Sequence, residues 1–294
     1  MRASAGHDVP PLIGWRDPAH DYHRPVHDLV AGAVKVAAAA RDIVVRPPEG
    51  ITVLIYHRVG GPGGAVDLDP GRFDAQMAEL AASGQVRTLD RAVDEATGDA
   101  PFDGGSVTVT FDDGTGDFVD HAVPILAEHR VPATIYVATR FVDEGIDFPG
   151  GGPAVSWAGL RDACSTGLIT VGSHTHGHAL LDRITAAQVA EELDRSIELI
   201  GEHLGAAPAH FEYPKAVLGS TAAQAEVATR FRSAAIAGTK ANPPGLTDPQ
   251  QLARSPIQVA DGMRFFRRKA RGGLGLEDEL RRRVNRRRYA GAST

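Results

Sequence analysis

Hydrophobic and polar residues follow two different spacings between about residue 51 and residue 237. Short apolar runs are typical of strands buried in a parallel sheet, and they occur at 51–56, 107–111, 134–137, 168–171, near Phe211 and at 234–237. Hydrophobic residues three and four positions apart predict helices at about 73–81, 117–130, 157–164, 185–205 and 222–231. Alternating strands and helices imply parallel strands joined by helical crossovers. The pattern therefore predicts an α/β protein and leaves open whether the sheet is open or closed into a barrel.

Both ends of the chain depart from this alternation. An Ala-rich segment at about 26–42 predicts a single helix, and the pair Pro47-Pro48 after it cannot continue a helix. We therefore expect an N-terminal helical arm at residues 1–50, one α/β domain at 51–262 and a basic C-terminal tail at 263–294.

Charge is distributed unevenly along the chain. The 294 residues carry a formal net charge of −6, which argues against a general nucleic-acid binder. Residues 264–294 hold 11 basic and 3 acidic residues, so the rest of the chain is strongly acidic. Such a basic run is usually a solvated helix or a chain end, but it also suits an anionic membrane surface. We expect no nucleic-acid partner and keep the membrane surface as a possible one.

No apolar stretch reaches the roughly 18 residues that span a bilayer. The best candidate, residues 29–40, is short and is interrupted by Lys35. The first 28 residues are polar and mixed in charge, unlike a signal peptide. We expect a cytoplasmic protein, with the inner membrane face as an alternative location. The single cysteine, Cys164, excludes a disulfide within the chain and a four-cysteine zinc site.

Polar residues that can bind metal or transfer protons follow three of the predicted strands. They are His57 after the first strand, Asp112 and Asp113 after the second, and the run His174-Thr-His-Gly-His178 after the fourth. In α/β folds the carboxyl ends of the strands are where sites are built. One aspartate can bind a cation while its neighbour acts as a base, although Asp-Asp-Gly is also a common turn sequence.

The spacing of the histidines decides which of them could share one ion. On an extended strand, His174 and His178 would lie about 13 Å apart, too far for a common ligand bound at about 2 Å. In a helical turn, which Gly177 permits, they would approach to about 6 Å and His176 would point elsewhere. Two histidines and one aspartate would leave a coordination position for water, whose pKa a metal ion lowers towards 7.

These residues lie in segments that resemble a known family. The segment from Val107 to Val137, VTVTFDDGTGDFVDHAVPILAEHRVPATIYV, is similar to the first motif of the polysaccharide deacetylases, the NodB-homology group or carbohydrate esterase family four. The stretch from Ser156, SWAGLRDACSTGLITVGSHTHGHALL, resembles their second motif, His-[Ser/Thr]-x-x-His. LIYHRV at Leu54 and FEYP at 211–214 also fit, so the resemblance covers about residues 51–260.

The resemblance implies a distorted (β/α)7 barrel that removes acetyl groups from N-acetylated sugars or polysaccharides. It implies Asp112 as the general base and one divalent metal ion held by Asp113, His174 and His178. Zinc is our first choice for this ion, with cobalt, nickel and manganese left open. The resemblance further implies a substrate-binding set in which the backbone N–H of Lys215 helps hold the oxyanion, with Tyr213, Pro214 and Arg254 beside it.

The chain departs from the family pattern at two places. Many members carry arginine two residues before the third-motif proline, where this chain has Glu212. The Leu-x-His motif, whose histidine protonates the leaving amine, has no counterpart here, because the last histidine is His210. His57 and His176 are then the candidate acids, and the alternative for His57 is a structural hydrogen bond. The alternative for Arg254 is a structural ion pair.

Two functions remain after these observations. The first is a metal-dependent hydrolase that acts on a non-peptide carbon–nitrogen bond of an acetylated sugar or glycan. The second is a catalytically impaired carbohydrate-binding or scaffold protein that keeps the barrel. The retained aspartates and histidines favour the enzyme, whereas the missing Leu-x-His motif and Glu212 favour the second function.

Overall fold

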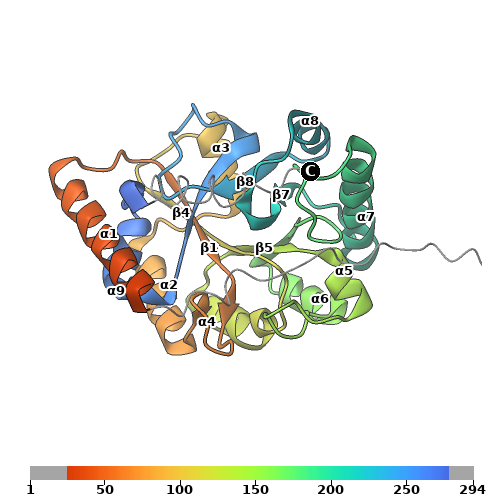
Figure 1. Ribbon diagram of the computed structural model, residues 1–294, viewed down its shortest axis with the longest axis horizontal. Helices are drawn as coiled ribbons and strands as arrows, with labels where there is room; N and C mark the ends of the chain where they lie inside the picture. The colour runs from red at the N-terminus through yellow and green to blue at the C-terminus, as the bar shows by residue number, and fades with distance from the viewer. Residues whose placement is uncertain (1–24, 278–294) are drawn as a thin grey trace, which may run out of the picture.

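Seven parallel strands form a closed barrel in the computed structural model, which describes residues 25–277 (Figure 1). In barrel order the strands are β1 (Ile51–Tyr56), β4 (Ser106–Phe111), β5 (Ala133–Val137), β6 (Ile169–Ser173), β7 (His210–Glu212), β8 (Ser233–Ala237) and β9 (Leu252–Pro256). β9 pairs with β1 and closes the ring. The predicted α/β class and distorted (β/α)7 barrel are therefore confirmed. Most of the distortion lies between β6 and β7, which pair at only one position, Ser173 with Phe211.

Helices surround the barrel and cover its outer face (Figure 1). They are α1 (Pro25–Val44), α2 (Pro70–Ser83), α3 (Leu89–Thr97), α4 (Val123–His129), α5 (Thr139–Glu144), α6 (Trp157–Ser165), α7 (Ala186–Leu204), α8 (Thr221–Arg230) and α9 (Gly262–Lys269). None of the helices in the described range is long and apolar enough to cross a membrane. A short parallel pair, β2 (Arg58–Val59) with β3 (Asp67–Leu68), lies outside the barrel.

Local sequence signals fix where several of these helices begin. Asp69, Thr88, Ser156 and Ser220 each accept a backbone hydrogen bond at the start of a helix. A capping box is present at the start of α7, where Thr185 and Gln188 bond reciprocally. Each such cap typically contributes about 1 kcal/mol to the free energy of unfolding.

The structure corrects one predicted helix and adds α3, α5 and α9. The continuous helix expected at 117–130 is instead a π-helical turn, Phe118–Ala122, followed by α4. Pro124 at the start of α4 has no N–H to continue a regular helical hydrogen-bond ladder, which accounts for the change. The sequence pattern did not predict α3 or α5, because both are short and a helical period needs several turns to be recognised.

α1 and α9 lie side by side at one edge of the barrel (Figure 1). Lys35 on α1 and Lys269 on α9 are both buried, and both pair with the buried carboxylate of Asp261. Lys35, which interrupts the apolar stretch of the N-terminal helix, is therefore paired in the interior. Part of the basic tail, up to Glu277, is folded against the barrel, whereas 278–294 and the first 24 residues of the arm lie outside the described residues.

Candidate metal and catalytic site

Three side chains that could bind one metal ion meet at the carboxyl ends of β4 and β6. The carboxylate of Asp113 lies 3.5 Å from Nε2 of His174 and 3.6 Å from Nε2 of His178. The two imidazole ring centres are 4.7 Å apart. The structure thus brings together the three residues that the sequence predicts as metal ligands.

Backbone in the left-handed region makes this convergence possible. Asp113 has φ 76°, which is outside the extended range. The side chains of Asp112 and Asp113 therefore do not simply point to opposite faces, as those of neighbouring residues on an extended strand do. Thr175 and His178, at φ 64° and 58°, bend the chain after β6. The helical turn that the sequence allows between His174 and His178 is absent, because this stretch forms bends without a helix. The histidines converge through these two left-handed residues instead.

Strain of this kind is concentrated around the site. Five of the seven described non-glycine residues with positive φ lie in the loops that follow β4, β6 and β7: Asp113, Thr175, His178, Lys215 and Ala216. Left-handed backbone costs a non-glycine residue about 1–3 kcal/mol and persists where surrounding structure enforces it, commonly at functional sites. The distribution marks this edge of the barrel as the functional one.

A buried carboxylate holds the far side of the His174 ring. Nδ1 of His174 lies 2.5 Å from Oε2 of Glu212 and 3.1 Å from the Glu212 carbonyl oxygen. Both side chains are almost fully buried, at 2% and 1% exposure. Contact at Nδ1 leaves Nε2 directed at Asp113, which is the arrangement that a metal-binding histidine needs. Glu212, a departure from the family motif in sequence, is thus an integral part of the site.

Asp112 is bound by an arginine inside the barrel. Nη1 and Nη2 of Arg254 donate to the two carboxylate oxygens of Asp112 at 2.7 and 2.9 Å. Arg254 lies in the middle of β9, is fully buried, and also pairs with Glu212 at 2.8 Å and donates to Thr110 Oγ1 at 3.0 Å. The sequence predicted Arg254 as a substrate-binding residue or an ion pair. Its complete burial leaves it no surface for a substrate, and the ion pair is what the structure contains.

His57 lies beside the metal-binding group, whereas His176 does not. His57 follows β1, is half-buried and has a buried Nδ1 without a hydrogen-bond partner in the described chain. It lies close enough to Asp113 to lower the pKa of that carboxyl. His176 instead contacts Thr139 through Nδ1 at 3.0 Å, away from the other histidines. His210, at the start of β7, contacts Asp90 and Ser233 at the opposite end of the strand.

The predicted substrate-binding residues after β7 differ in their exposure. Tyr213 and Pro214 are buried, and Tyr213 packs edge-on against Phe211 with ring centres 5.0 Å apart. Burial, with Asp248 nearby, raises the pKa of Tyr213 to about 12. Lys215 is exposed at this edge of the barrel. Of this group only Lys215 is exposed to solvent, and Tyr213 and Pro214 are buried in the chain before it.

Two aromatic residues that could have stacked on a sugar are packing residues. Trp157 stacks on His203 with ring centres 4.4 Å apart, and Tyr136 is fully buried with Arg254 5.1 Å from its ring centre.

The histidines around Asp113 favour its ionised form. Burial acts to raise the pKa of Asp113, but His174, His57 and His178 together hold it well below its usual range. Burial, followed by the neighbouring His174, lowers the pKa of His178 to about 3. His178 is therefore neutral at pH 7, whereas Glu212 and Asp113, acting against burial, raise the pKa of His174 above its usual range.

The residues present fit a divalent ion. Ligand atoms bound to one zinc ion at about 2.0–2.2 Å lie roughly 3–4 Å apart, in line with the separations of Asp113 from the two histidines. Two imidazoles and one carboxylate form a set that zinc and other first-row metals accept, with a position left for water or substrate. The 21% exposure of the Asp113 side chain gives solvent access to this set.

Comparisons with known proteins identify relatives of this barrel. The sequence model of the polysaccharide deacetylase family matches residues 99–234. YxkH of Bacillus subtilis (strain 168), itself named only provisionally as a polysaccharide deacetylase, is 25% identical over 183 residues. That match covers 62% of this chain and 62% of YxkH, so the chain spans less than two thirds of its relative's length.

Solved structures share the barrel over most of this chain. IcaB from Ammonifex degensii superposes with a TM-score of 0.66 at 26% identity, over 77% of this chain and 99% of IcaB. A polysaccharide deacetylase from Bacillus cereus gives 0.63 at 24% identity over 76% and 69% of the two chains. The deacetylase PplD of Streptococcus pyogenes, solved with acetate, gives 0.61 at 20% identity over 72% and 93%. The last two support the fold alone.

Proposed function

Because the chain belongs to the polysaccharide deacetylase family, we propose that it is a metal-dependent hydrolase that removes acetyl groups from an N-acetylated sugar or polysaccharide. The observation that supports this most is the convergence of Asp113, His174 and His178 beside a second carboxylate, Asp112, that is held by Arg254. Separate groups for binding an ion and for taking a proton are what amide hydrolysis at neutral pH requires.

Asp113, His174 and His178 would hold the ion, with zinc our first choice. When bound there, the ion would lower the pKa of water and polarise the acetyl carbonyl. Glu212 would keep Nε2 of His174 directed at the ion by its contact with Nδ1.

Asp112 would act as the general base. An ionised carboxylate has about four acceptor positions, and Arg254 occupies only two of those on Asp112. The carboxylate can therefore take a proton from the attacking water while the guanidinium fixes its orientation. Arg254 is in this proposal a positioning residue rather than a substrate-binding one.

The remaining steps concern the oxyanion and the leaving amine. The exposed Lys215 would provide its backbone N–H to the carbonyl oxygen as that oxygen becomes negative. Cleavage of the carbon–nitrogen bond yields acetate and an amine, and the amine nitrogen gains a proton as it leaves. His57, half-buried beside Asp113, would donate this proton in place of the missing Leu-x-His histidine.

The specific experiment is acetate release from a panel of N- and O-acetylated glycans, with and without a chelator. We expect release by the wild type that chelation abolishes. Asp112→Asn should lower the rate by about 10²–10⁴-fold, the usual contribution of a positioned general base, while metal content stays the same. A normal rate in this variant would refute the role of Asp112.

The impaired carbohydrate-binding protein is the competing proposal, motivated by the absent Leu-x-His motif. It predicts that glycans bind without acetate release in the presence of any of the candidate metals. The same panel therefore distinguishes the two functions, and His57→Gln separates them further. If His57 is the acid, this variant should slow release from amides more than from esters, because an amine leaving group needs protonation and an alcohol needs it less.

A further inference from the structure

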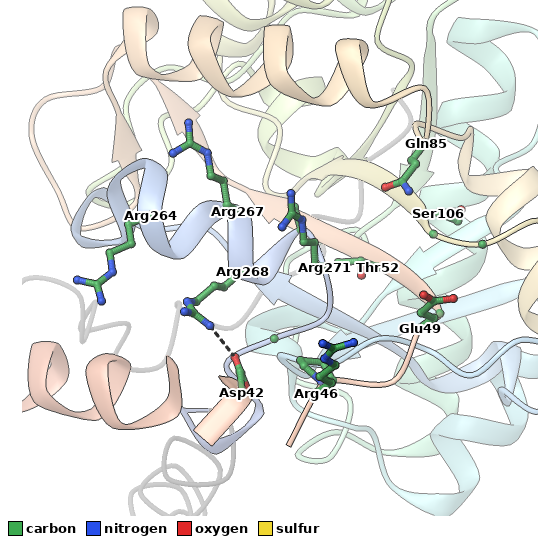
Figure 2. A pocket seen from close by; sticks show the side chains of 16 residues that line it. Asp42, Arg46, Glu49, Thr52, Gln85, Ser106, Arg264, Arg267, Arg268 and Arg271 are labelled. Carbon is green, nitrogen blue, oxygen red and sulfur yellow. Dashed lines mark ion pairs between the residues drawn. The ribbon is translucent and has the colours of Figure 1, made fainter. Parts of the chain in front are cut away.

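Figure 2 shows a cleft, of about 790 Å³, at the amino ends of β1 and β4. Asp113 follows the carboxyl end of β4 and so lies at the opposite end of the barrel. The chain segment after α1, the starts of the two strands, and α9 with the residues after it form its walls. No residue of the proposed deacetylase site lines this cleft. Its function is therefore a separate question.

Arginines dominate the walls of the cleft, which we call the basic cleft. The five that line it are Arg46, Arg264, Arg267, Arg268 and Arg271 (Figure 2). Two carboxylates, Asp42 and Glu49, also line it, so the lining carries an excess of positive charge. The end of the N-terminal helix and the described part of the basic tail therefore line the same cleft.

Neighbouring carboxylates neutralise only some of these arginines. Arg267 pairs with Glu79 at 2.9 Å, and Arg268 lies 3.9 Å from Asp42. Arg46 and Arg271 are exposed and form no ion pair within residues 25–277. Arg46 and Arg271, from opposite ends of the chain, thus line one concave surface without a carboxylate partner in that range, as does Arg264, whose guanidinium lies over the Phe265 ring.

The inner wall of the cleft also has unused hydrogen-bonding capacity. Ser106 lines it, is only 2% exposed, and its Oγ has no hydrogen-bond partner among the described residues. Gly104, at φ 87° with open space around its missing side chain, leaves backbone uncovered beside it. An unsatisfied buried hydroxyl is a place where a bound group or an ordered water gains a hydrogen bond.

We propose that the basic cleft binds a phosphate-bearing ligand through Arg46 and Arg271. A guanidinium group offers a planar fork of donors that matches phosphate oxygens and forms charge-assisted bonds of about twice the usual strength. A concave site with several arginines suits a compact group with more than one negative charge, such as a phosphomonoester or a pyrophosphate. The phosphate belongs either to a soluble phosphorylated compound or to an anionic lipid headgroup.

The test measures binding by the full chain, with two probes. The soluble probe is inorganic pyrophosphate, followed by calorimetry at low ionic strength. The lipid probe is sedimentation with phosphatidylglycerol vesicles, compared with phosphatidylcholine vesicles. The test variant is Arg46→Ala/Arg271→Ala. The control is Arg161→Ala/Arg195→Ala, which removes the same two charges from α6 and α7, outside the cleft.

We expect at least one probe to bind the wild type, with affinity falling by about tenfold or more in the test variant and by less than twofold in the control. If pyrophosphate binds and its affinity falls only in the test variant, the ligand is a soluble phosphorylated compound. If only vesicles bind and their affinity falls only in the test variant, the ligand is a lipid headgroup. Equal losses in the two variants, no loss in the test variant, or no binding of either probe would overturn the proposal. Arg46→Gln/Arg271→Gln replaces the test variant if its thermal unfolding temperature differs from that of the wild type.

Neither the calorimetry nor the vesicle sedimentation depends on acetate release. A failure of the phosphate proposal therefore leaves the deacetylase proposal intact, and the reverse also holds.

Discussion

Glu212 connects the two halves of the proposed active site. Its side chain is 1% exposed, lies 2.5 Å from Nδ1 of His174 and pairs with Arg254 at 2.8 Å. One oxygen thus faces the metal-binding set and the other faces the arginine that holds Asp112. A residue that differs from the family motif in sequence thus contacts both a proposed metal ligand, His174, and Arg254, which holds the proposed base.

Replacing this carboxylate with an amide of the same shape tests that link. Glu212→Gln should weaken metal binding by about 10–100-fold, the usual effect of losing a group that orients a metal-binding histidine. The measurement is a titration of metal-depleted protein against a chelator of known affinity. Glu198→Gln, an exposed glutamate paired with Arg195 on α7, is the control and should leave affinity unchanged. Equal affinities in the wild type and Glu212→Gln would contradict the role of Glu212.

The sequence identified most of these residues because of a simple rule. His57, Asp112, Asp113, His174 and His178 all follow apolar strands, and parallel strands bring their carboxyl ends to one edge. The partners of Asp112 could not be found this way, since Arg254 is 142 residues away and its register in β9 depends on barrel closure. The left-handed backbone at Thr175 was also beyond prediction, because threonine rarely adopts it without tertiary support.

At the scale of elements, α3 shows why a short helix escapes prediction. Five of its nine residues, LDRAVDEAT, are polar, and besides its buried apolar face it is held to the barrel by ion pairs. Asp90 contacts His210 at 3.2 Å and Arg232 at 2.8 Å, and Asp94 also pairs with Arg232. These partners lie on or beside β7 and β8, more than a hundred residues away in sequence. Periodicity within the helix carries no information about them.

The attachment of α3 should depend on pH. The hydrogen bond from His210 and the nearby Arg232, acting against burial, lower the pKa of Asp90 to about 2. Because the pKa is lower in the folded than in the unfolded chain, ionised Asp90 stabilises the fold above about pH 4, and this contribution disappears as the pH falls towards 2. Solvent screening limits it to about 1 kcal/mol, since the side chain is 55% exposed.

Urea unfolding between pH 3 and pH 7 measures this effect. Asp90→Asn should lower the free energy of unfolding by about 1 kcal/mol at pH 6 and by less at pH 3. Asp103→Asn, which removes an exposed aspartate, should change it little at either pH. A difference between Asp90→Asn and wild type that stays constant over this range would exclude titration of Asp90 as the cause.

At the scale of the whole molecule, ends that look separate in sequence are joined. Lys35 on α1 and Lys269 on α9 share the buried carboxylate of Asp261, and Glu277 lies 3.4 and 3.6 Å from the two lysines. Burial lowers the pKa of Lys269, so the cluster depends on its carboxylates. The boundaries that composition suggests between arm, barrel domain and tail therefore separate residues that pack against one another in the fold.

Removing that shared carboxylate should loosen both terminal helices. Asp261→Asn leaves two buried ammonium groups with one fewer counter-charge and should destabilise the fold by about 3–5 kcal/mol. Asp194→Asn, which breaks an exposed pair with Arg230, should cost less than about 1 kcal/mol. Thermal unfolding of the two variants compares the costs, and equal shifts would show that α1 and α9 do not depend on the buried cluster.

The two ends of the barrel carry different chemistry. The carboxyl end gathers carboxylates and histidines around a proposed metal ion, and the amino end gathers arginines around the basic cleft. The positive excess of residues 264–294 is thus partly explained by α9, whose arginines line that cleft. The proposed active site and the basic cleft thus occupy opposite ends of the barrel.

The most direct test of the proposed function is a metal titration of metal-depleted protein, with bound metal and acetate release measured on the same samples. We predict that release rises in proportion to bound zinc and reaches its maximum at about one ion per chain, the stoichiometry expected of a single three-ligand site. His178→Ala should bind far less metal and release far less acetate while the barrel stays folded. Acetate release that continues unchanged in the metal-free protein, or that is equal in His178→Ala, would contradict a metal-dependent deacetylase at this site.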